Sequence, residues 1–261
     1  MRSRIESLVS ESLKKVGIDI GYVNNTVRNP EKYINVLEGA ISVRKPLNII
    51  QVGANDGKYN DPIYEFVKKR KNSTNIILIE PLEMLIPYLK ENYEYHPSAE
   101  IFNKAVGERE NTSSIYLYRI KKEYWDDIDS RESVPDYRAP TGVTTSNKDR
   151  LFRWASENVQ SESDPEYIIE EFEVEMIQSR DILNQSDIME DVHVLQVDTE
   201  GMDDRVVYSF LEEGIRPNII NIESKLLSKD RRKKYDKRLL EFGYEIYDYV
   251  SSEKLALWYK A

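Results

Sequence analysis

Residues 48–57 read Asn-Ile-Ile-Gln-Val-Gly-Ala-Asn-Asp-Gly, and this stretch decides the fold. Its first half belongs to a short apolar run, residues 47–52, which predicts a buried strand. Its second half is a turn that begins and ends with glycine, which lets a backbone approach a ligand closely. Because ligands of open parallel sheets bind beyond the carboxyl ends of the strands, we expect a nucleotide-binding loop at residues 53–57.

Strand-like and helix-like segments alternate after this loop. Further strand-like runs are expected at residues 75–79, 100–105, 114–119, 171–177, 192–197 and 218–222, and helices at 82–93, 205–211 and 229–242. Another helix is expected to begin at Pro62, with Asp61 as its N-cap and an apolar stripe of Ile63, Phe66 and Val67. Two β-rich runs, residues 244–250 and 255–260, predict a closing hairpin. Such alternation is typical of an α/β fold with a mostly parallel sheet and helices on both faces.

Two segments differ from this pattern. Residues 1–45 carry two helix-like stretches, at about 5–16 and 30–43, and we interpret them as a helical appendage that covers a face of the main domain or packs against a partner. The main domain would then span residues 46–261. Residues 121–170, called the insert below, are rich in charge and weakly periodic, which predicts a lid or a binding loop.

The composition excludes several kinds of partner and chemistry. The chain has 261 residues and a formal charge of −10, from 37 basic and 47 acidic side chains, which disfavours a nucleic acid partner. It has no cysteine, so disulfides, thiolate metal sites and cysteine nucleophiles are ruled out. No apolar run is long enough to span a bilayer and no signal peptide is evident, so we expect a cytoplasmic protein.

The loop at residues 53–57 lacks the signatures of phosphate-binding loops. Neither the G-x-G-x-x-G fingerprint nor a P-loop is present, which weakens the case for NAD or ATP. S-adenosylmethionine has no pyrophosphate and fits better. Asn55 and Asp56 would engage its amino and carboxylate groups, and Glu80, after the second strand, would accept hydrogen bonds from the ribose. The alternative is a tight turn, with Glu80 as a helix cap or a surface charge.

Two later strands also end in carboxylates. Residues 194–201 read Val-Leu-Gln-Val-Asp-Thr-Glu-Gly, and residues 219–223 read Ile-Ile-Asn-Ile-Glu. Asp198 and Glu223 should therefore lie on the same rim of the sheet as the loop, where they would act as a general base, orient a hydroxyl or hold a divalent metal. The alternative is that Asp198 caps a helix and Glu223 pairs with Lys225 or an arginine.

Neither histidine is assigned as a base. His96 precedes a proline in a turn-like stretch and is expected at the surface. His193 enters the strand that ends at Asp198, so it should lie at the far end of that strand from the proposed site.

The ordered motifs resemble those of the FkbM-type methyltransferases over residues 48–223. The first motif is residues 49–57 with the Asp61-Pro62 and Phe66-Val67-Lys68-Lys69 that follow, and the second is Ile79-Glu80-Pro81. The later ones are Asn103-Lys104-Ala105-Val106-Gly107, the Asp-x-Glu-Gly strand at residues 195–201, and Ile222-Glu223. One departure is Met202-Asp203, where the family commonly has Ala-Glu, so the role of Asp203 stays open.

The resemblance implies a Rossmann-like class I methyltransferase fold, with a seven-stranded sheet, that uses S-adenosylmethionine as methyl donor. It also implies transfer to oxygen, often on a sugar or a natural product. The expected catalytic residues are Asp198 and Glu223. The expected cofactor-binding residues are Gln51, Gly53, Asn55, Asp56, Gly57, Glu80, Pro81, Lys104, Ala105, Val106 and Asp198.

The acceptor side of the site is less defined. Trp125, Tyr137, Phe152 and Trp154 in the insert would wall a small-molecule or glycan acceptor, or else pack within a lid. Two alternatives stay open: a metal-dependent, catechol-type O-methyltransferase with Asp198 and Glu223 as ligands of a divalent metal, and a non-catalytic binding or scaffold module. A homo-oligomer through the N-terminal helices is also expected.

Overall fold

The computed structural model describes residues 31–107, 113–128, 135–161, 164–250 and 252–258. In chain order the elements are α2 (Glu31–Val43), β1 (Leu47–Val52), α3 (Tyr64–Lys69), β2 (Thr74–Ile79), the 3₁₀ turn η1 (Glu83–Leu85), α4 (Ile86–Tyr93), β3 (Ala99–Phe102), β4 (Ala105–Gly107), β5 (Ser114–Ile120), η2 (Lys122–Asp127), α5 (Arg138–Thr141), α6 (Lys148–Asn158), α7 (Pro165–Ile168), β6 (Ile169–Gln178), α8 (Ser179–Gln185), β7 (Val194–Val197), α9 (Asp203–Glu212), β8 (Ile219–Glu223), α10 (Lys229–Glu241), β9 (Tyr244–Val250) and β10 (Glu253–Trp258).

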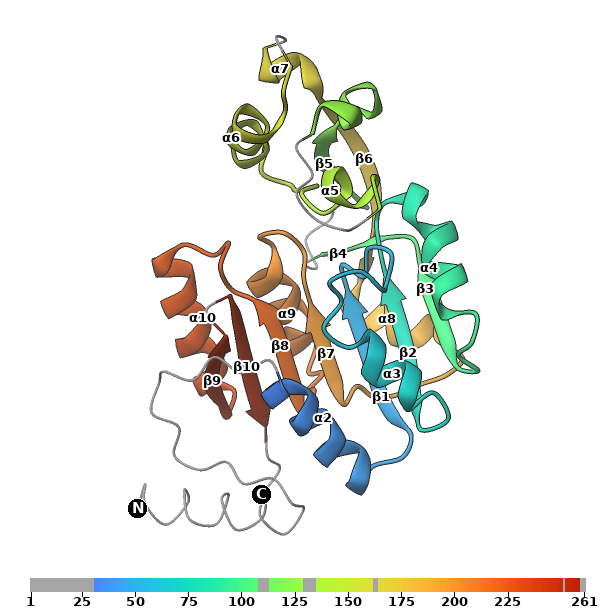
Figure 1. The fold of residues 1–261 in the computed structure, drawn as a ribbon. Coiled ribbons are helices and arrows are strands. Elements are labelled where there is room, and N and C mark those ends of the chain that lie inside the picture. Colours follow the sequence, from blue (N-terminus) through green and yellow to red (C-terminus); the bar gives the residue numbers. More distant parts are fainter. Residues whose placement is uncertain (1–30, 108–112, 129–134, 162–163, 251, 259–261) are drawn as a thin grey trace.

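The main sheet has seven strands in the order β3-β2-β1-β7-β8-β10-β9 (Figure 1). Neighbouring strands from β3 to β8 pair in parallel, whereas β10 is antiparallel to both β8 and β9. The prediction of a mostly parallel seven-stranded sheet with a C-terminal hairpin is therefore confirmed. The strand order reverses between β1 and β7, and a ligand crevice is expected at such a switch point.

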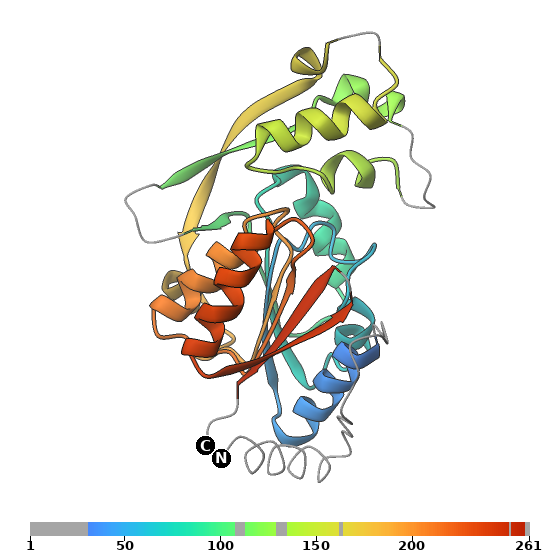
Figure 2. The ribbon, with the colours of Figure 1, turned by 90° about the vertical axis from the view of Figure 1, so that its left-hand side faces the viewer.

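Helices cover both faces of the main sheet (Figure 2). Ile50 and Val52 of β1 pack in one hydrophobic cluster with α8, α9 and α10, whereas Leu47 and Ile49 pack in a second cluster with α2, α3 and α4. Successive side chains of a strand point to opposite faces, and all six residues of β1 are buried because both of its faces are covered.

The helix α2 is part of the core of this sheet. Tyr33, Leu37 and Ile41 recur every four residues, so they lie on one side of the helix, and all three are buried in the second cluster. The expected helix at residues 5–16, and any contact between copies through it, lie outside the described residues. In the part of the chain that the structure describes, no helix has the length and apolar character needed to cross a membrane.

The insert contains more regular structure than its weak periodicity indicated. It holds η2, α5, α6 and α7, and Leu151 and Ala155 of α6 pack with Ile120 and Ile128 in a hydrophobic cluster separate from the main core. The strand expected at residues 100–105 is in fact two strands. β3 pairs with β2 in the main sheet, whereas β4 joins a second sheet of order β4-β6-β5 that carries the insert.

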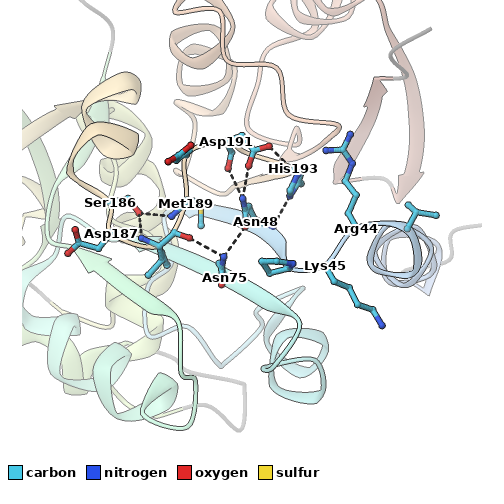
Figure 3. A pocket seen from close by; sticks show the side chains of 13 residues that line it. Arg44, Lys45, Asn48, Asn75, Ser186, Asp187, Met189, Asp191 and His193 are labelled. Carbon is cyan, nitrogen blue, oxygen red and sulfur yellow. Dashed lines mark hydrogen bonds and ion pairs between the residues drawn. The ribbon is translucent and has the colours of Figure 1, made fainter.

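A groove lies at the amino ends of β1 and β2 (Figure 3). This is the end of the sheet opposite to the insert (Figure 1). Asn48 donates from its side chain to the Asp191 carboxylate at 2.7 Å and from its backbone N–H to Nδ1 of His193 at 2.9 Å. Burial lowers the pKa of His193, which favours the neutral ring that accepts this bond. These hydrogen bonds hold residues 188–193 against the amino ends of β1 and β2.

The position expected for His96 is wrong. Its side chain is only 7% exposed, and its Nε2 lies 2.9 Å from the Thr74 hydroxyl. Neither histidine lies at the carboxyl ends of the strands, so neither is close to the carboxylates described next.

Candidate active site

The turn after β1 brings three strand ends together at Gly53. Its N–H donates to the carbonyl of Ile79 at 2.9 Å, and the N–H of Asp198 donates to the carbonyl of Val52 at 2.9 Å. Gly53 has a φ of +78°, and a Cβ at this position would lie 1.7 Å from the Asp198 carbonyl oxygen. Only glycine fits here, and it holds the loop directly against the end of β7.

Asp56 is used to build this loop. Its side chain is fully buried, and one oxygen accepts the backbone N–H groups of Lys58 and Tyr59 at 3.0 and 3.1 Å. The other oxygen accepts a hydrogen bond from the Tyr137 hydroxyl at 3.1 Å. The structure therefore places Asp56 between the loop and the insert, where it shapes the loop and does not face a ligand directly.

Gln51 and Gly57 also lie on the side of the loop that faces away from the cavity. The Gln51 amide donates to the Asp61 carboxylate at 2.5 Å, and Gly57 sits against Leu89 and Tyr93. Of the predicted loop residues, Gly53 and Asn55 face the open side.

Glu80 closes the end of β2 and is only 4% exposed. Its two oxygens accept the backbone N–H groups of Asn55 at 2.7 Å and Leu82 at 2.9 Å. Each carboxylate oxygen has a second lone pair, so Glu80 can still accept hydrogen bonds from a ligand. Burial raises the pKa of Glu80 to about 7, although the two backbone bonds and Arg138 favour the charged form.

A cavity lies between these strand ends and the insert. The structure brings eight of the predicted cofactor residues to its wall: Gly53, Asn55, Glu80, Pro81, Lys104, Ala105, Val106 and Asp198. Apolar wall is supplied by Val52, Leu82, Ile115 and Leu117, and the insert adds Arg138, Thr141, Gly142, Thr144, Thr145 and Ser146. Gln51, Asp56, Gly57 and Glu223 are not in this wall.

Carboxylates gather on one side of the cavity. Oxygens of Asp198, Glu200 and Glu223 lie within 4.8 Å of one another. One buried oxygen of Asp198 and one of Glu223 have no hydrogen-bond partner among the described residues. Burial, followed by the charges of Glu223 and Glu200, raises the pKa of Asp198 well above its ordinary value. The set therefore tends to hold a proton, and Asp198 is a stronger base than an exposed aspartate.

Of the two structural roles that the sequence left open, Asp198 does not have the first and Glu223 has the second. Asp198 does not cap α9, because the loop before that helix is held by Asp203, which accepts the N–H groups of Thr199 and Gly201 at 3.3 and 3.2 Å. This is also the role of Asp203, which the sequence left open. Glu223, in contrast, pairs with the Lys225 ammonium at 2.5 Å.

The insert is bound to both sides of the cavity. Arg150 donates to the backbone carbonyl of Glu200 at 3.1 Å and pairs with its carboxylate at 2.5 Å, and Thr145 donates to the same carbonyl at 3.0 Å. On the other side, the Tyr137 hydroxyl donates to the carboxylate of Asp56 in the loop at 3.1 Å, and the Tyr137 ring stacks on Tyr88 of α4 at 4.3 Å between centroids. The insert thus covers the cavity and contacts the two loops that form it.

The aromatic side chains expected to wall an acceptor lie elsewhere. Trp125, Phe152 and Trp154 pack against the hydrophobic cluster of the insert, and the Trp125 indole donates to the carbonyl of Ile120 at 3.0 Å. These three side chains therefore pack within the insert, which was the second of the two roles expected for them. Arg138, Thr145 and Arg150 were not singled out from the sequence, because their contacts join segments that are far apart in the chain.

The site fits S-adenosylmethionine in its chemistry. The carboxyl groups of Glu80 and Asp198 lie in the cavity wall at the ends of β2 and β7. Combined with a strand order that reverses at Gly53 and an antiparallel β10 near the edge, these features define a class I S-adenosylmethionine-dependent methyltransferase. The model of the methyltransferase FkbM domain matches residues 51–251, and the chain belongs to that family.

Comparison with other proteins gives general similarity only. No curated protein sequence matches the chain. Among solved structures, a precorrin-6y C5,15-methyltransferase from Geobacter metallireducens is 8% identical, with 91% of this chain and 93% of that chain covered and a TM-score of 0.42. Aeropyrum pernix fibrillarin with bound S-adenosyl-L-methionine is 9% identical, with 82% of this chain and 66% of that chain covered and a TM-score of 0.38. The CMeT domain of a citrinin polyketide synthase is 12% identical, with 89% of this chain and 52% of that chain covered and a TM-score of 0.43.

Proposed function

We propose that the protein methylates a hydroxyl oxygen of a small molecule, such as a sugar, a glycan unit or another natural product. The observation that supports this most is the unpartnered carboxylate oxygen of Asp198 in the wall of the cavity. A hydroxyl must lose its proton as it is methylated, and a buried carboxylate with a raised pKa is suited to accept it.

In this proposal, the residues of the cavity have separate roles in cofactor binding and in proton transfer. When bound, S-adenosylmethionine supplies a methyl group on a positively charged sulfur. The leaving group is then a neutral thioether, which needs no proton from the protein. Glu80 would accept hydrogen bonds from the ribose hydroxyls of the bound cofactor, and Lys104 and Val106 would border its adenine. Asp198 would accept the proton of the acceptor hydroxyl while the methyl group passes from sulfur to that oxygen, with Glu223 beside it. Much of the catalysis then comes from positioning the two reactants.

A metal-dependent reaction of the catechol type is the second candidate, because the oxygens of Asp198, Glu200 and Glu223 are close enough to share one cation. Against it, Arg150 and Lys225 already pair with Glu200 and Glu223. Treatment with EDTA separates the two mechanisms. We expect methyl transfer to persist in EDTA, and loss of transfer that is restored by Mg²⁺ would favour the metal-dependent reaction.

Binding of the cofactor and its product is the first test. Calorimetry should show that the wild-type protein binds S-adenosylhomocysteine, and absence of binding would overturn the proposal. A panel of hydroxyl acceptors, with the methylated atom identified in the product, then tests the transfer to oxygen. Binding of the cofactor without transfer to any acceptor would favour a binding module.

Replacing Glu80 with glutamine should weaken binding of S-adenosylhomocysteine by about 10- to 100-fold, since hydrogen bonds to a charged acceptor are lost. Glutamine can accept only one of the two backbone bonds that Glu80 now accepts, so the melting temperature is measured alongside. Glu83→Gln is the matched control, because Glu83 is exposed and close by in the chain. Equal affinity of the two variants would remove Glu80 from the site.

Affinity for S-adenosylhomocysteine should also depend on pH through Glu80. Ribose hydroxyls favour the ionised carboxylate, whose pKa is about 7 in the free protein. Below that pH a proton must first be released, so affinity should fall by about tenfold per pH unit as the pH drops. The Glu80→Gln variant should lose this part of the slope, and an identical slope in both proteins would assign it to another group.

A further inference from the structure

Arg138 is the first residue of α5 in the insert, and it lies in the wall of the cavity. Its guanidinium carries five N–H donors. The hydrogen bonds found for it are two long ones, of 3.4 and 3.3 Å, to a single acceptor, the carbonyl of Tyr59. Among the described residues it takes part in no ion pair, whereas the other cation of the wall, Lys104, pairs with Glu175. Arg138 is thus a cation with unused donors facing a cavity.

The position of this guanidinium is built by its surroundings. Gly142 makes room for it, because a Cβ at that residue would lie 2.4 Å from an Nη atom of Arg138. The preceding residue, Tyr137, is held by its hydrogen bond to Asp56 and its stacking on Tyr88. The backbone before α5 is therefore tied to the loop that follows β1, and Arg138 is presented over that loop.

The charges around Arg138 show which parts of the cavity it faces. Its positive charge lowers the pKa of both Glu80 and Asp198, so it lies within electrostatic reach of the end of β2 and the end of β7. Between these strand ends lies Gly53, where the backbone is open to a ligand. The remaining charged side chains of the wall, apart from the paired Lys104, are acidic. Arg138 is suited to bind an anionic group that lies between the loop and the carboxylates of Asp198 and Glu200.

We propose that Arg138 binds the carboxylate of the methionine end of S-adenosylmethionine, and that the insert thereby contributes directly to the cofactor site. This inference rests on the proposed function. The cofactor carries one carboxylate and two positive centres, the sulfonium and the α-ammonium. Glu80 and Asp198 suit its ribose and its positive centres, but neither suits a carboxylate. An arginine fork matches the two oxygens of a carboxylate in geometry and in charge.

The test compares two ligands that differ in this end of the molecule. S-adenosylhomocysteine carries the amino-acid carboxylate, whereas 5′-methylthioadenosine has the same nucleoside without it. In Arg138→Gln, affinity for S-adenosylhomocysteine should fall by about 10- to 100-fold, as for a lost charge-assisted hydrogen bond. Affinity for 5′-methylthioadenosine should stay within about threefold of wild type, which also shows that the variant is folded and its nucleoside site intact.

Two further variants complete the design. Arg153→Gln removes a positive charge from an exposed position on α6 of the same insert and should change neither affinity. Arg138→Lys keeps the positive charge but lacks the two parallel N–H donors of arginine. Its affinity for S-adenosylhomocysteine should lie between those of the wild type and Arg138→Gln. An unchanged ratio of the two affinities in Arg138→Gln would overturn the inference while leaving the methyltransferase proposal intact. Failure of the wild-type protein to bind S-adenosylhomocysteine would overturn both.

Discussion

Asp198→Asn should lower the turnover number for methyl transfer by about 10²- to 10⁴-fold, the usual contribution of a general base. Asparagine keeps the size of the side chain but cannot accept the hydroxyl proton. Affinity for S-adenosylhomocysteine should change by only a few-fold, because the loop backbone at Gly53 and the carboxylate of Glu80 are untouched. The measurement is formation of the methylated product, with calorimetry of the cofactor product in parallel.

The control for this prediction is Asp187→Asn, which removes an exposed carboxylate at the opposite end of the sheet and should leave turnover unchanged. If Asp198→Asn keeps full turnover with saturating cofactor and acceptor, Asp198 is not the base. A large loss in Glu223→Gln alone would then transfer that role to Glu223.

The pH profile of turnover provides an independent check on the same residue. A base acts only when ionised, so the rate should rise with pH as Asp198 loses its proton. Burial and the neighbouring Glu223 and Glu200 place this rise above the ordinary range of an aspartate. Glu223→Gln removes one of the like charges, which lowers the pKa of Asp198 and should shift the rise to lower pH. A shift to higher pH would contradict this arrangement.

The centre of the main sheet was predictable because its strands are buried on both faces. β1 and β2 therefore appear in the sequence as short apolar runs, and the same is true of β7 and β8. The boundary between β3 and β4 was missed because residues 100–105 form one continuous strand-like run. It is broken by Asn103, whose side chain donates to the carbonyls of Glu80 and Pro81 at 2.9 and 3.1 Å. That tertiary contact ends β3 and leaves no local signal.

The candidate site was predictable on the sheet side and not on the insert side. Gly53, Glu80 and Asp198 each follow an apolar strand, so parallel topology alone brings them together. Arg138 and Arg150 belong to short helices whose positions depend on contacts with Tyr59 and Glu200, far away in the sequence. The aromatic residues of the insert were conspicuous in the sequence, but an insert with its own hydrophobic cluster needs such residues for packing.

Gly53→Ala should strongly destabilise the protein, because among the described glycines this position has the closest approach to a backbone atom. The new Cβ would lie 1.7 Å from the Asp198 carbonyl oxygen, and alanine disfavours the φ of +78°. To relieve the clash, the end of β1 must move away from β7, which breaks the 2.9 Å hydrogen bond that Asp198 now donates to the carbonyl of Val52. We expect the free energy of unfolding to fall by about 3–5 kcal/mol, since such strain and buried bond losses fall in the upper range of single substitutions.

Gly214→Ala separates the two causes of that loss. Gly214 has a nearly identical φ of +79°, but a Cβ there would meet no atom within 4 Å. Its cost is therefore the backbone strain alone, about 1–2 kcal/mol. Urea denaturation of both variants should show that Gly53→Ala is the less stable, and calorimetry should show that it alone loses S-adenosylhomocysteine. Equal stability of the two variants would mean that the close approach between Gly53 and Asp198 is not rigid, and then the loop would not hold the cofactor cavity in shape.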